Sequence, residues 1–284
     1  MMSLRVRRIT TFLLLGLLLA GVTFASGCGT KKTESGTAGL SGTLTIAGST
    51  SVQPFSEVLA EEFMAKNKNV QVNVQGGGSS QGVEAAVSGA TDIGSASRDL
   101  KDEEKAKATL VSTPIAIDGV AIVVNSANKV TSLTSEQVKN IYLGNVKNWK
   151  DIGGSNAPIT VVTREDGSGT REAFSKGIMN EENIINSAIV QNSTGAVRTT
   201  VAGDKNAIGY VSMASVNSEV KAVDLDGVAA TEANVKSGQY KLQRPFIYIT
   251  KDAPKGLAKA FIDFVLSNEG QKIIVDEGAY SVNK

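Results

Sequence analysis

The sequence contains no histidine, and this absence excludes more chemistry than any other feature of the composition. Histidine is the commonest general base near neutral pH, the commonest metal ligand and a member of the Ser-His-Asp triad. The chain also has no Walker motif, with its Gly-Lys-Ser/Thr ending, and no evident cluster of metal-binding side chains. We therefore expect a protein that is not an enzyme and that holds neither a metal ion nor a cofactor.

Cysteine, aromatic residues and net charge are also scarce. A single cysteine permits no internal disulfide, so the composition gives no sign of the redox compartment. Aromatic residues make up 5% of the chain, and 29 basic residues are balanced by 28 acidic ones. Nucleic-acid binding requires a basic surface, which this composition does not indicate. If an anion binds here, local hydrogen-bond donors rather than net charge must hold it.

The first 28 residues have the pattern of an export signal. Three arginines precede an apolar run of about 16 residues, which is shorter than the roughly 20 residues of a membrane-spanning helix. Ala25-Ser26-Gly27-Cys28 follows and resembles a bacterial lipobox, in which cleavage precedes the cysteine and a lipid such as palmitate is attached to it. Ala25 stands where that pattern usually has leucine. We expect residues 1–28 to be a lipoprotein signal peptide and a lipid on Cys28 to hold the protein on the extracytoplasmic side of the cell membrane.

Plain signal cleavage and a retained anchor are the alternatives at this end of the chain. A buried, structural role for Cys28 is disfavoured, because the Gly/Ser/Lys/Thr-rich residues 29–41 that follow predict a flexible tether. The 256 residues after Cys28 are long enough for two lobes.

Short β-branched runs alternate with helical patterns from Thr43 onward, which predicts an α/β fold with parallel sheets covered by helices. The apolar run 115–124 is too long for one edge strand, so we expect it to cross between two lobes, with a hinge near 117–119. Residues 245–250 are predicted to carry the chain back. This assigns 42–117 and 245–284 to lobe I and 118–244 to lobe II. The predicted strands also include 44–47, 70–74, 92–96, 159–163 and 207–212, and the predicted helices include 51–67, 134–141, 171–178 and 256–266.

A strand, a Gly/Ser/Thr loop and a helix follow one another three times, with the loops at 48–51, 78–80 and 167–170. The first turn of a helix has free amide hydrogens and a partial positive charge, and glycine lets the backbone approach a ligand closely. Each loop is a potential anion site, although serine and threonine also serve as ordinary helix caps. The third loop stands out because Arg164 precedes Ser168 and can grip an oxyanion with two hydrogen bonds, while Asp166 holds the guanidinium.

Several stretches in order resemble the phosphate-binding proteins of ABC-type phosphate uptake systems, and the resemblance extends from about Thr43 to the end of the chain. Two of these stretches lie outside the three loops, at 141–149 and 267–271. The others are Gly48-Ser49-Thr50-Ser51-Val52, Gly78-Ser79-Ser80-Gln81-Gly82, Asp92-Ile93-Gly94-Ser95-Ala96-Ser97-Arg98 and Arg164-Glu165-Asp166-Gly167-Ser168-Gly169-Thr170.

This resemblance implies a two-lobed clamshell of the periplasmic-binding-protein type II class with two crossover strands. It implies a monomer that captures inorganic phosphate between its lobes and docks on the permease subunits of an ABC transporter. The phosphate contacts that it implies are Thr50, Ser51, Ser79, Arg164, Ser168, Gly169 and Thr170.

One position departs from the family pattern. Ser97 stands where better-known members carry an aspartate that accepts the proton of bound hydrogen phosphate. Such a carboxylate favours phosphate over sulfate, which has no proton to donate. We therefore consider Asp118, at the predicted hinge, as a replacement acceptor and Arg98 as a second cationic donor. A strand-end aspartate bonded to backbone amides is the alternative for Asp118.

Three other functions remain open at this point. The same helix starts would suit another tetrahedral oxyanion, such as sulfate, molybdate or tungstate. A hydrolytic or phosphoryl-transfer enzyme with Ser168 as nucleophile is disfavoured by the missing base and metal cluster. A purely structural surface lipoprotein would have no use for three donor-rich loops.

Overall fold

The computed structural model describes residues 39–283, so the predicted signal peptide, the lipidation of Cys28 and nearly all of the predicted tether lie outside the described residues. Strand β1 (Ser41–Gly48) begins within the last residue assigned to the tether. It is longer than predicted because it pairs in parallel along its whole length with β2 (Asn69–Gly76). Within residues 39–283 no helix has the length and apolar character needed to cross a membrane.

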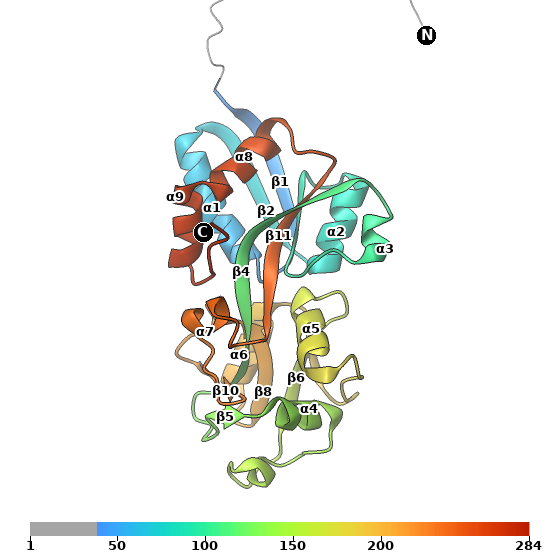
Figure 1. Cartoon of the computed structure of the whole chain (residues 1–284), viewed down its shortest axis with the longest axis vertical. Coiled ribbons are helices and arrows are strands. Elements are labelled where there is room, and N and C mark those ends of the chain that lie inside the picture. The colour runs from blue at the N-terminus through green and yellow to red at the C-terminus, as the bar shows by residue number, and fades with distance from the viewer. Residues whose placement is uncertain (1–38, 284) are drawn as a thin grey trace, which may run out of the picture. The chain divides into compact units, whose positions relative to one another are not determined.

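The first lobe is a parallel β2-β1-β3 sheet with helices packed against it (Figure 1). Helix α1 (Gln53–Lys66) starts with a proline in its first turn, where the missing amide hydrogen costs no helical hydrogen bond. Its buried side meets the C-terminal helices, and the Phe63 and Phe261 rings pack edge to face with centroids 5.2 Å apart. The other elements of this lobe are α2 (Ser79–Ser88), β3 (Ile93–Ala96), α3 (Asp102–Lys105), α8 (Gly256–Leu266) and α9 (Asn268–Asp276).

Two long antiparallel strands join the lobes, as the sequence predicted. Strand β4 (Leu110–Asn125) pairs with β11 (Gln243–Lys251) up to Gly119 and with β8 (Ala207–Ser212) from Val120 onward. Figure 1 shows β4 and β11 running side by side from one group of elements into the other. The change of partner falls at the end of the predicted hinge. Before this point the buried side chains of β4 belong to the core of the first lobe, and after it they belong to the cores of the second.

The second lobe extends the sheet through β8, β6 (Thr160–Arg164) and β7 (Ile189–Gln191). Its core combines aliphatic side chains with aromatic rings, of which Phe174 and Tyr210 stack with centroids 4.1 Å apart. Helix α4 (Ser135–Leu143) begins with a capping box between Thr134 and Gln137, which agrees with the predicted helix start. The remaining elements are β5 (Ser132–Leu133), η1 (Trp149–Ile152), α5 (Gly169–Phe174), η2 (Ser175–Met179), α6 (Thr194–Gly203), η3 (Met213–Ser215), β9 (Val220–Ala222), β10 (Asp224–Leu225) and α7 (Glu232–Lys236).

The predicted helix at 171–178 differs from the structure in its bounds. Helix α5 starts two residues earlier, because Ser168 caps it by accepting a hydrogen bond from the Arg171 amide. It then widens into the π-helical turn η2, which ends at Asn180 in the left-handed conformation. Helices α3, α6, α7 and α9 were not predicted.

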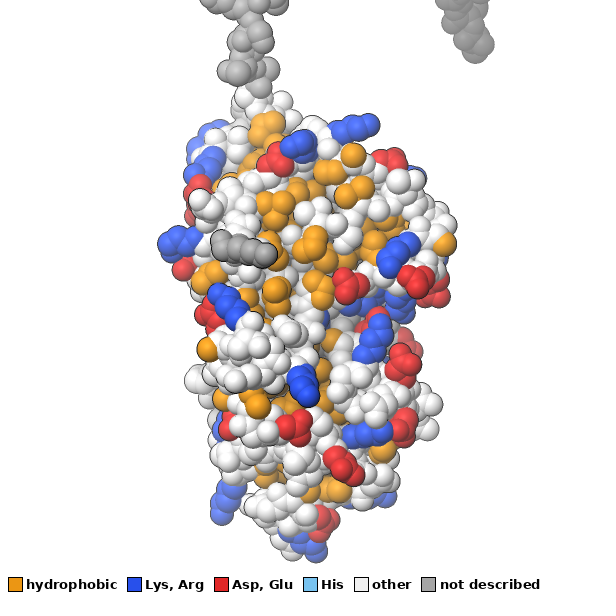
Figure 2. Space-filling model, viewed as in Figure 1, with side chains coloured by type: hydrophobic (Ala, Val, Ile, Leu, Met, Phe, Trp, Pro, Cys, Tyr) orange, Lys and Arg blue, Asp and Glu red, His pale blue; other side chains and the backbone are white. Residues whose placement is uncertain are grey.

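Charged side chains of both signs are interspersed on the face shown in Figure 2, without an extended basic region. This distribution agrees with the near balance of 29 basic and 28 acidic residues in the chain.

Candidate functional site

The first predicted loop follows β1 and faces the cleft between the lobes. Gly48 adopts a φ of +141°, and a Cβ there would lie 2.1 Å from the Ser95 carbonyl oxygen, so only glycine fits. This close approach sets the chain against β3 and directs Thr50 and Ser51 toward the second lobe. The Ser51 hydroxyl lies 3.0 Å from the Thr170 hydroxyl and 2.8 Å from that of Thr194.

The second predicted loop ends at Ser79, the first residue of α2, which is fully buried. Its hydroxyl accepts a hydrogen bond from the Ser97 amide at 3.0 Å and lies 3.3 Å from the Ser97 hydroxyl. The neighbouring Ser80 amide donates to the Gly167 carbonyl at 3.0 Å. The second loop thus meets the third directly, although they belong to different lobes.

The third predicted loop closes over the other two. Gly169 lies so near them that a Cβ would stand 2.4 Å from the Ser79 hydroxyl and 2.6 Å from the Ser97 hydroxyl. Ser168 and Thr170 are both buried beside it. The structure therefore brings all three predicted loops together, with their hydroxyl groups in one cluster. We call Ser51, Ser79, Ser97, Thr170 and Thr194 the hydroxyl cluster.

Arg164 reaches this cluster from the end of β6, and 1% of its surface is exposed. Its guanidinium donates to the Thr50 hydroxyl at 3.1 Å and to the Thr194 hydroxyl at 3.0 Å. The Glu165 carboxylate accepts two further hydrogen bonds from it, at 2.7 and 2.8 Å. A buried guanidinium held in this way is a preorganised donor for an oxyanion.

The prediction that Asp166 holds Arg164 is wrong. The Asp166 side chain is 96% exposed and pairs with Arg171 at 3.0 Å. The chain turns sharply at Gly167, whose φ is +84°, and this turn leaves Asp166 on the outside while Glu165 lies against Arg164.

Asp118 is fully buried on β4, directly opposite Arg244 of β11. One carboxylate oxygen accepts from the Ser212 hydroxyl at 2.7 Å, and the other accepts from Arg244 at 3.0 and 3.2 Å. Burial raises the pKa of Asp118 above its ordinary value, and the Arg244 charge and the Ser212 hydrogen bond partly offset this rise. Both oxygens of the predicted proton acceptor are therefore engaged by side chains.

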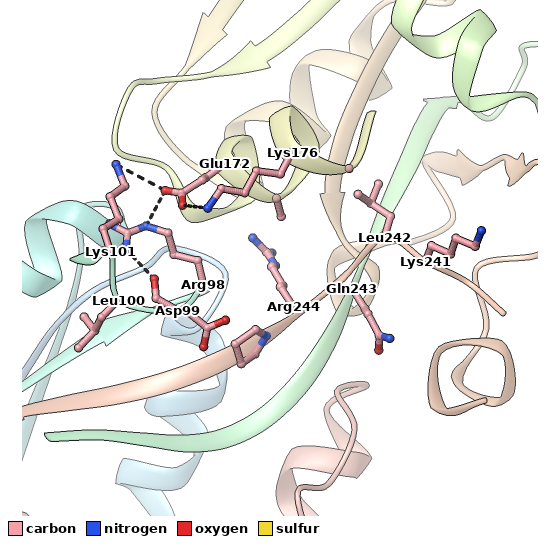
Figure 3. Close-up of a pocket in the computed structure, with 13 residues that line it drawn as sticks. Arg98, Asp99, Leu100, Lys101, Glu172, Lys176, Lys241, Leu242, Gln243 and Arg244 are labelled. Atoms are coloured by element: carbon pink, nitrogen blue, oxygen red, sulfur yellow. Dashed lines mark hydrogen bonds and ion pairs between the residues drawn. The ribbon is translucent and has the colours of Figure 1, made fainter. Parts of the chain in front are cut away.

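Arg98 lies at the edge of the cleft rather than in the hydroxyl cluster. Its guanidinium donates to both Glu104 oxygens, at 2.7 and 2.8 Å, and to the Ser80 hydroxyl at 3.0 Å. Its Nε lies 3.0 Å from the Glu172 carboxylate of the second lobe. Figure 3 shows Arg98 and Glu172 facing each other, with Lys101 and Lys176 on either side.

Two residues of the site were missed by the sequence reasoning. Thr194 starts α6, and a signal for it exists, because strand 189–191, Asn192-Ser193-Thr194-Gly195 and a helix repeat the strand, loop and helix pattern a fourth time. Arg244 lies on the second crossover strand with no motif around it. Its guanidinium donates to the Ser97 hydroxyl at 3.0 Å and to the Ser51 hydroxyl at 3.1 Å.

A cavity of about 340 Å³ lies next to the cluster, with residues of both lobes in its wall. Arg244 forms part of the wall nearest the hinge, and Lys101, Lys176 and Lys241 contribute further cations (Figure 3). This cavity lies between the solvent-exposed lysines and the buried Arg244, where an approaching anion would be attracted.

The site is rich in hydrogen-bond donors. The two carboxylates that approach the cluster, Glu165 and Asp118, are each paired with a guanidinium. Among residues 39–283, no group of three or more acidic, cysteine or histidine side chains could hold a metal ion. Hydroxyls, helix amides and guanidinium groups in a buried cleft are suited to binding a tetrahedral oxyanion.

Residues 33–269 match the PBP superfamily domain. The phosphate-binding protein PstS of Bacillus subtilis is 36% identical over 277 residues, covering 93% of this chain and 91% of that protein. PstS of Staphylococcus aureus strain MRSA252 is 32% identical, covering 93% of this chain and 86% of that protein.

Solved structures agree with these sequence matches. A putative phosphate ABC transporter substrate-binding protein from Clostridium perfringens, solved with bound phosphate, has a TM-score of 0.82 and 44% identity, covering 85% of this chain and all of that one (100%). An ABC-type phosphate transport receptor from Vibrio cholerae has a TM-score of 0.70 and 39% identity, covering 84% of this chain and 99% of that one. The predicted α/β fold with two lobes is confirmed.

Proposed function

The chain belongs to the PBP superfamily and, within it, to the PstS phosphate-binding proteins, and on this premise we propose that it captures inorganic phosphate between its lobes and delivers it to an ABC transporter. The single observation that carries this proposal is the convergence of Arg164 with hydroxyl groups from both lobes. Such a set of donors matches an anion with four oxygens pointing in different directions.

We assign the phosphate contacts to the residues that the structure brings together. Each is buried or faces the cleft, and none of them is a hydrophobic side chain. They are Thr50, Ser51, Ser79, Ser97, Arg164, Ser168, Gly169 and Thr170, and Thr194 joins them. Charge-assisted hydrogen bonds of about 1.5–3 kcal/mol each are strong enough that a few of them reach micromolar affinity, about −8 kcal/mol. Asp118 as proton acceptor stays a prediction, and an experiment below tests it.

Closure of the lobes around the anion is supported by the contacts between them. The Ser80 amide donates to the Gly167 carbonyl, the Ser51 and Thr170 hydroxyls meet, and Arg98 faces Glu172 across the cleft. Separation of the lobes would break these contacts and bend the strands β4 and β11, and it would also affect the packing of Tyr280 and Ala214 on the cores of the opposite lobes. In the proposed cycle, phosphate docks on the first lobe, the second lobe closes over it, and the closed form docks on the permease.

The family is one of transport substrate-binding proteins rather than an enzyme family. We propose that this chain likewise has no catalytic activity and acts as a monomer. We also propose that it is exported, that residues 1–28 are removed and that a lipid on Cys28 anchors it outside the cell membrane. The tether after Cys28 would let the lobes reach the permease. Nucleic acid is not among the proposed partners.

Calorimetric titration of phosphate into the wild type and into Arg164→Gln tests this function. We expect saturable binding of one phosphate per chain, and a loss of affinity of about 100-fold or more in the variant because several charge-assisted hydrogen bonds disappear together. Titration in excess sulfate, molybdate or tungstate separates phosphate from the other oxyanions, since a phosphate site keeps its affinity in their presence. Absence of phosphate binding to the wild type would refute the proposal.

A further inference from the structure

Arg244 is a buried cation that neither the motifs nor the three loops account for. It lies on β11, at the point where this strand crosses between the lobes, and 5% of its surface is exposed. Two of its nitrogens donate to hydroxyls of the cluster, Ser97 and Ser51, at 3.0 and 3.1 Å. These two hydroxyls come from different loops, so the guanidinium joins two separate parts of the hydroxyl cluster.

The partner of Arg244 also lies on a crossover strand. Asp118 of β4 is directly opposite Arg244 in the antiparallel register and accepts two hydrogen bonds from it, at 3.0 and 3.2 Å. The second Asp118 oxygen is held by the Ser212 hydroxyl. A carboxylate fixed on both oxygens restricts the guanidinium to one orientation, with its remaining donors toward Ser97 and Ser51.

Arg164 and Arg244 approach the hydroxyl cluster from different strands. Arg164 donates to the Thr194 hydroxyl, which lies 2.8 Å from the Ser51 hydroxyl, and Arg244 donates to Ser51. The two like charges are thus separated by only two hydroxyl groups. Burial lowers the pKa of Arg244, the charge and hydrogen bond of Asp118 partly offset this, and the nearby Arg164 charge adds to the lowering. An anion between them would relieve this repulsion.

We propose that Arg244 is a second cationic contact of the bound anion and that Asp118 is the positioning residue that holds it there. This inference rests on the proposed phosphate-binding function and names a residue of that same site. A guanidinium that grips a carboxylate with one edge keeps donors on its other edge, which is the arrangement that Glu165 produces for Arg164. A buried ion pair of this kind adds little stability by itself, so a binding role explains why the fold carries it.

Four variants and a control test this assignment by phosphate calorimetry: Arg244→Gln, Arg244→Lys, Asp118→Asn, the double variant Asp118→Asn/Arg244→Gln, and the control Arg198→Gln. Arg198 lies on α6 of the second lobe, and its guanidinium donates to the Ser215 carbonyl rather than to the cluster. We expect Arg244→Gln to weaken phosphate binding about ten- to 150-fold, which is the loss of 1.5–3 kcal/mol for one charge-assisted contact. Arg244→Lys should restore part of it, and Arg198→Gln should bind as the wild type does.

The double variant separates positioning from proton acceptance. If Asp118 acts only through Arg244, Asp118→Asn changes the affinity by no more than threefold once Arg244 is already glutamine. If Asp118 itself accepts the phosphate proton, the same substitution costs a further tenfold or more in that background, and the proposal is overturned. The double variant neutralises both members of the buried pair, so it stays informative where a single substitution leaves one charge buried without its partner.

The results also separate this inference from the function on which it rests. Wild-type binding together with an Arg244→Gln variant that binds within twofold of it would refute the role of Arg244 and leave the phosphate-binding function in place. A wild type that binds no phosphate would instead refute the proposed function.

Discussion

Glu172 is the residue whose substitution tests lobe closure most selectively. Its carboxylate lies 3.0 Å from Arg98 Nε and 3.6 Å from Lys101 Nζ, both of the first lobe, and 2.8 Å from Lys176 Nζ on its own lobe. None of these four side chains belongs to the hydroxyl cluster. Glu172→Gln therefore removes an attraction that exists only when the lobes are together, and it leaves the proposed phosphate contacts intact.

The size of the effect follows from how far the pair is buried. The Arg98 side chain is 4% exposed and that of Glu172 is 19% exposed. Breaking a fully buried pair costs about 3–5 kcal/mol, and exposed pairs are worth about 0–1 kcal/mol. Arg98 keeps Glu104 as a partner in the variant, which reduces the loss. We expect the closed form to lose about 1–2 kcal/mol, which corresponds to a factor of roughly 5 to 30 in the equilibrium between closed and open forms.

Stopped-flow measurement of phosphate release is the direct assay. We expect release from Glu172→Gln to be faster by that factor, since opening must precede release, while the rate of association changes little. Lys176→Gln is the matched control, because Lys176 contacts the same carboxylate but from within the same lobe, and its side chain is 60% exposed. Equal effects of both substitutions on release, or no effect of Glu172→Gln, would refute the reasoning.

Three further predictions address the packing, the pH dependence and the anchor. Gly169→Ala places a methyl group 2.4 Å from the Ser79 hydroxyl, so calorimetry should show phosphate affinity reduced about tenfold or more. The melting temperature without phosphate should hardly change. Unaltered affinity would contradict the tight approach of the loops. Burial pushes the pKa of Glu104 up, but the hydrogen bonds from Arg98 and the neighbouring amide, with the nearby positive charges, outweigh it and hold the pKa below its ordinary value. This carboxylate therefore stabilises the fold at pH values above the ordinary glutamate pKa of about 4.3, and that contribution is lost as the pH falls through the lowered pKa. Acidification should reduce the stability of the wild type to urea more than that of Glu104→Gln. Equal losses of stability would count against the ion pair. Cys28→Ser should move the protein from the membrane fraction to the medium and abolish labelling by radioactive palmitate, and retention in the membrane would disprove lipid anchoring.

The sequence predicted those elements whose signals lie in residues that are close together in the chain. Strand 207–212 and helix 256–266 have the predicted bounds, because the strand is a continuous buried run and the helix has apolar residues at helical spacing. Arg164 and the three loops were found for the same reason, since a strand, a glycine-containing turn and a helix start are close together in the chain. The crossover role of 115–124 followed from its length and apolar character alone.

The remainder of the site depends on contacts between distant residues. Asp118 and Arg244 are 126 positions apart and meet only because β4 and β11 pair in one register, so no local pattern links them. The choice of Glu165 over Asp166 as the partner of Arg164 depends on the direction of the turn at Gly167. Helix α6 was missed although its start has the same strand, loop and helix signal as the three predicted loops.

The most direct test of the account is a calorimetric titration of phosphate into the wild type, Arg164→Gln and Arg244→Gln under one set of conditions. The account predicts one phosphate per wild-type chain and a weaker affinity in each variant, with the larger loss in Arg164→Gln. Wild-type affinity in both variants would contradict it, because the anion would then be held elsewhere than between the two guanidinium groups.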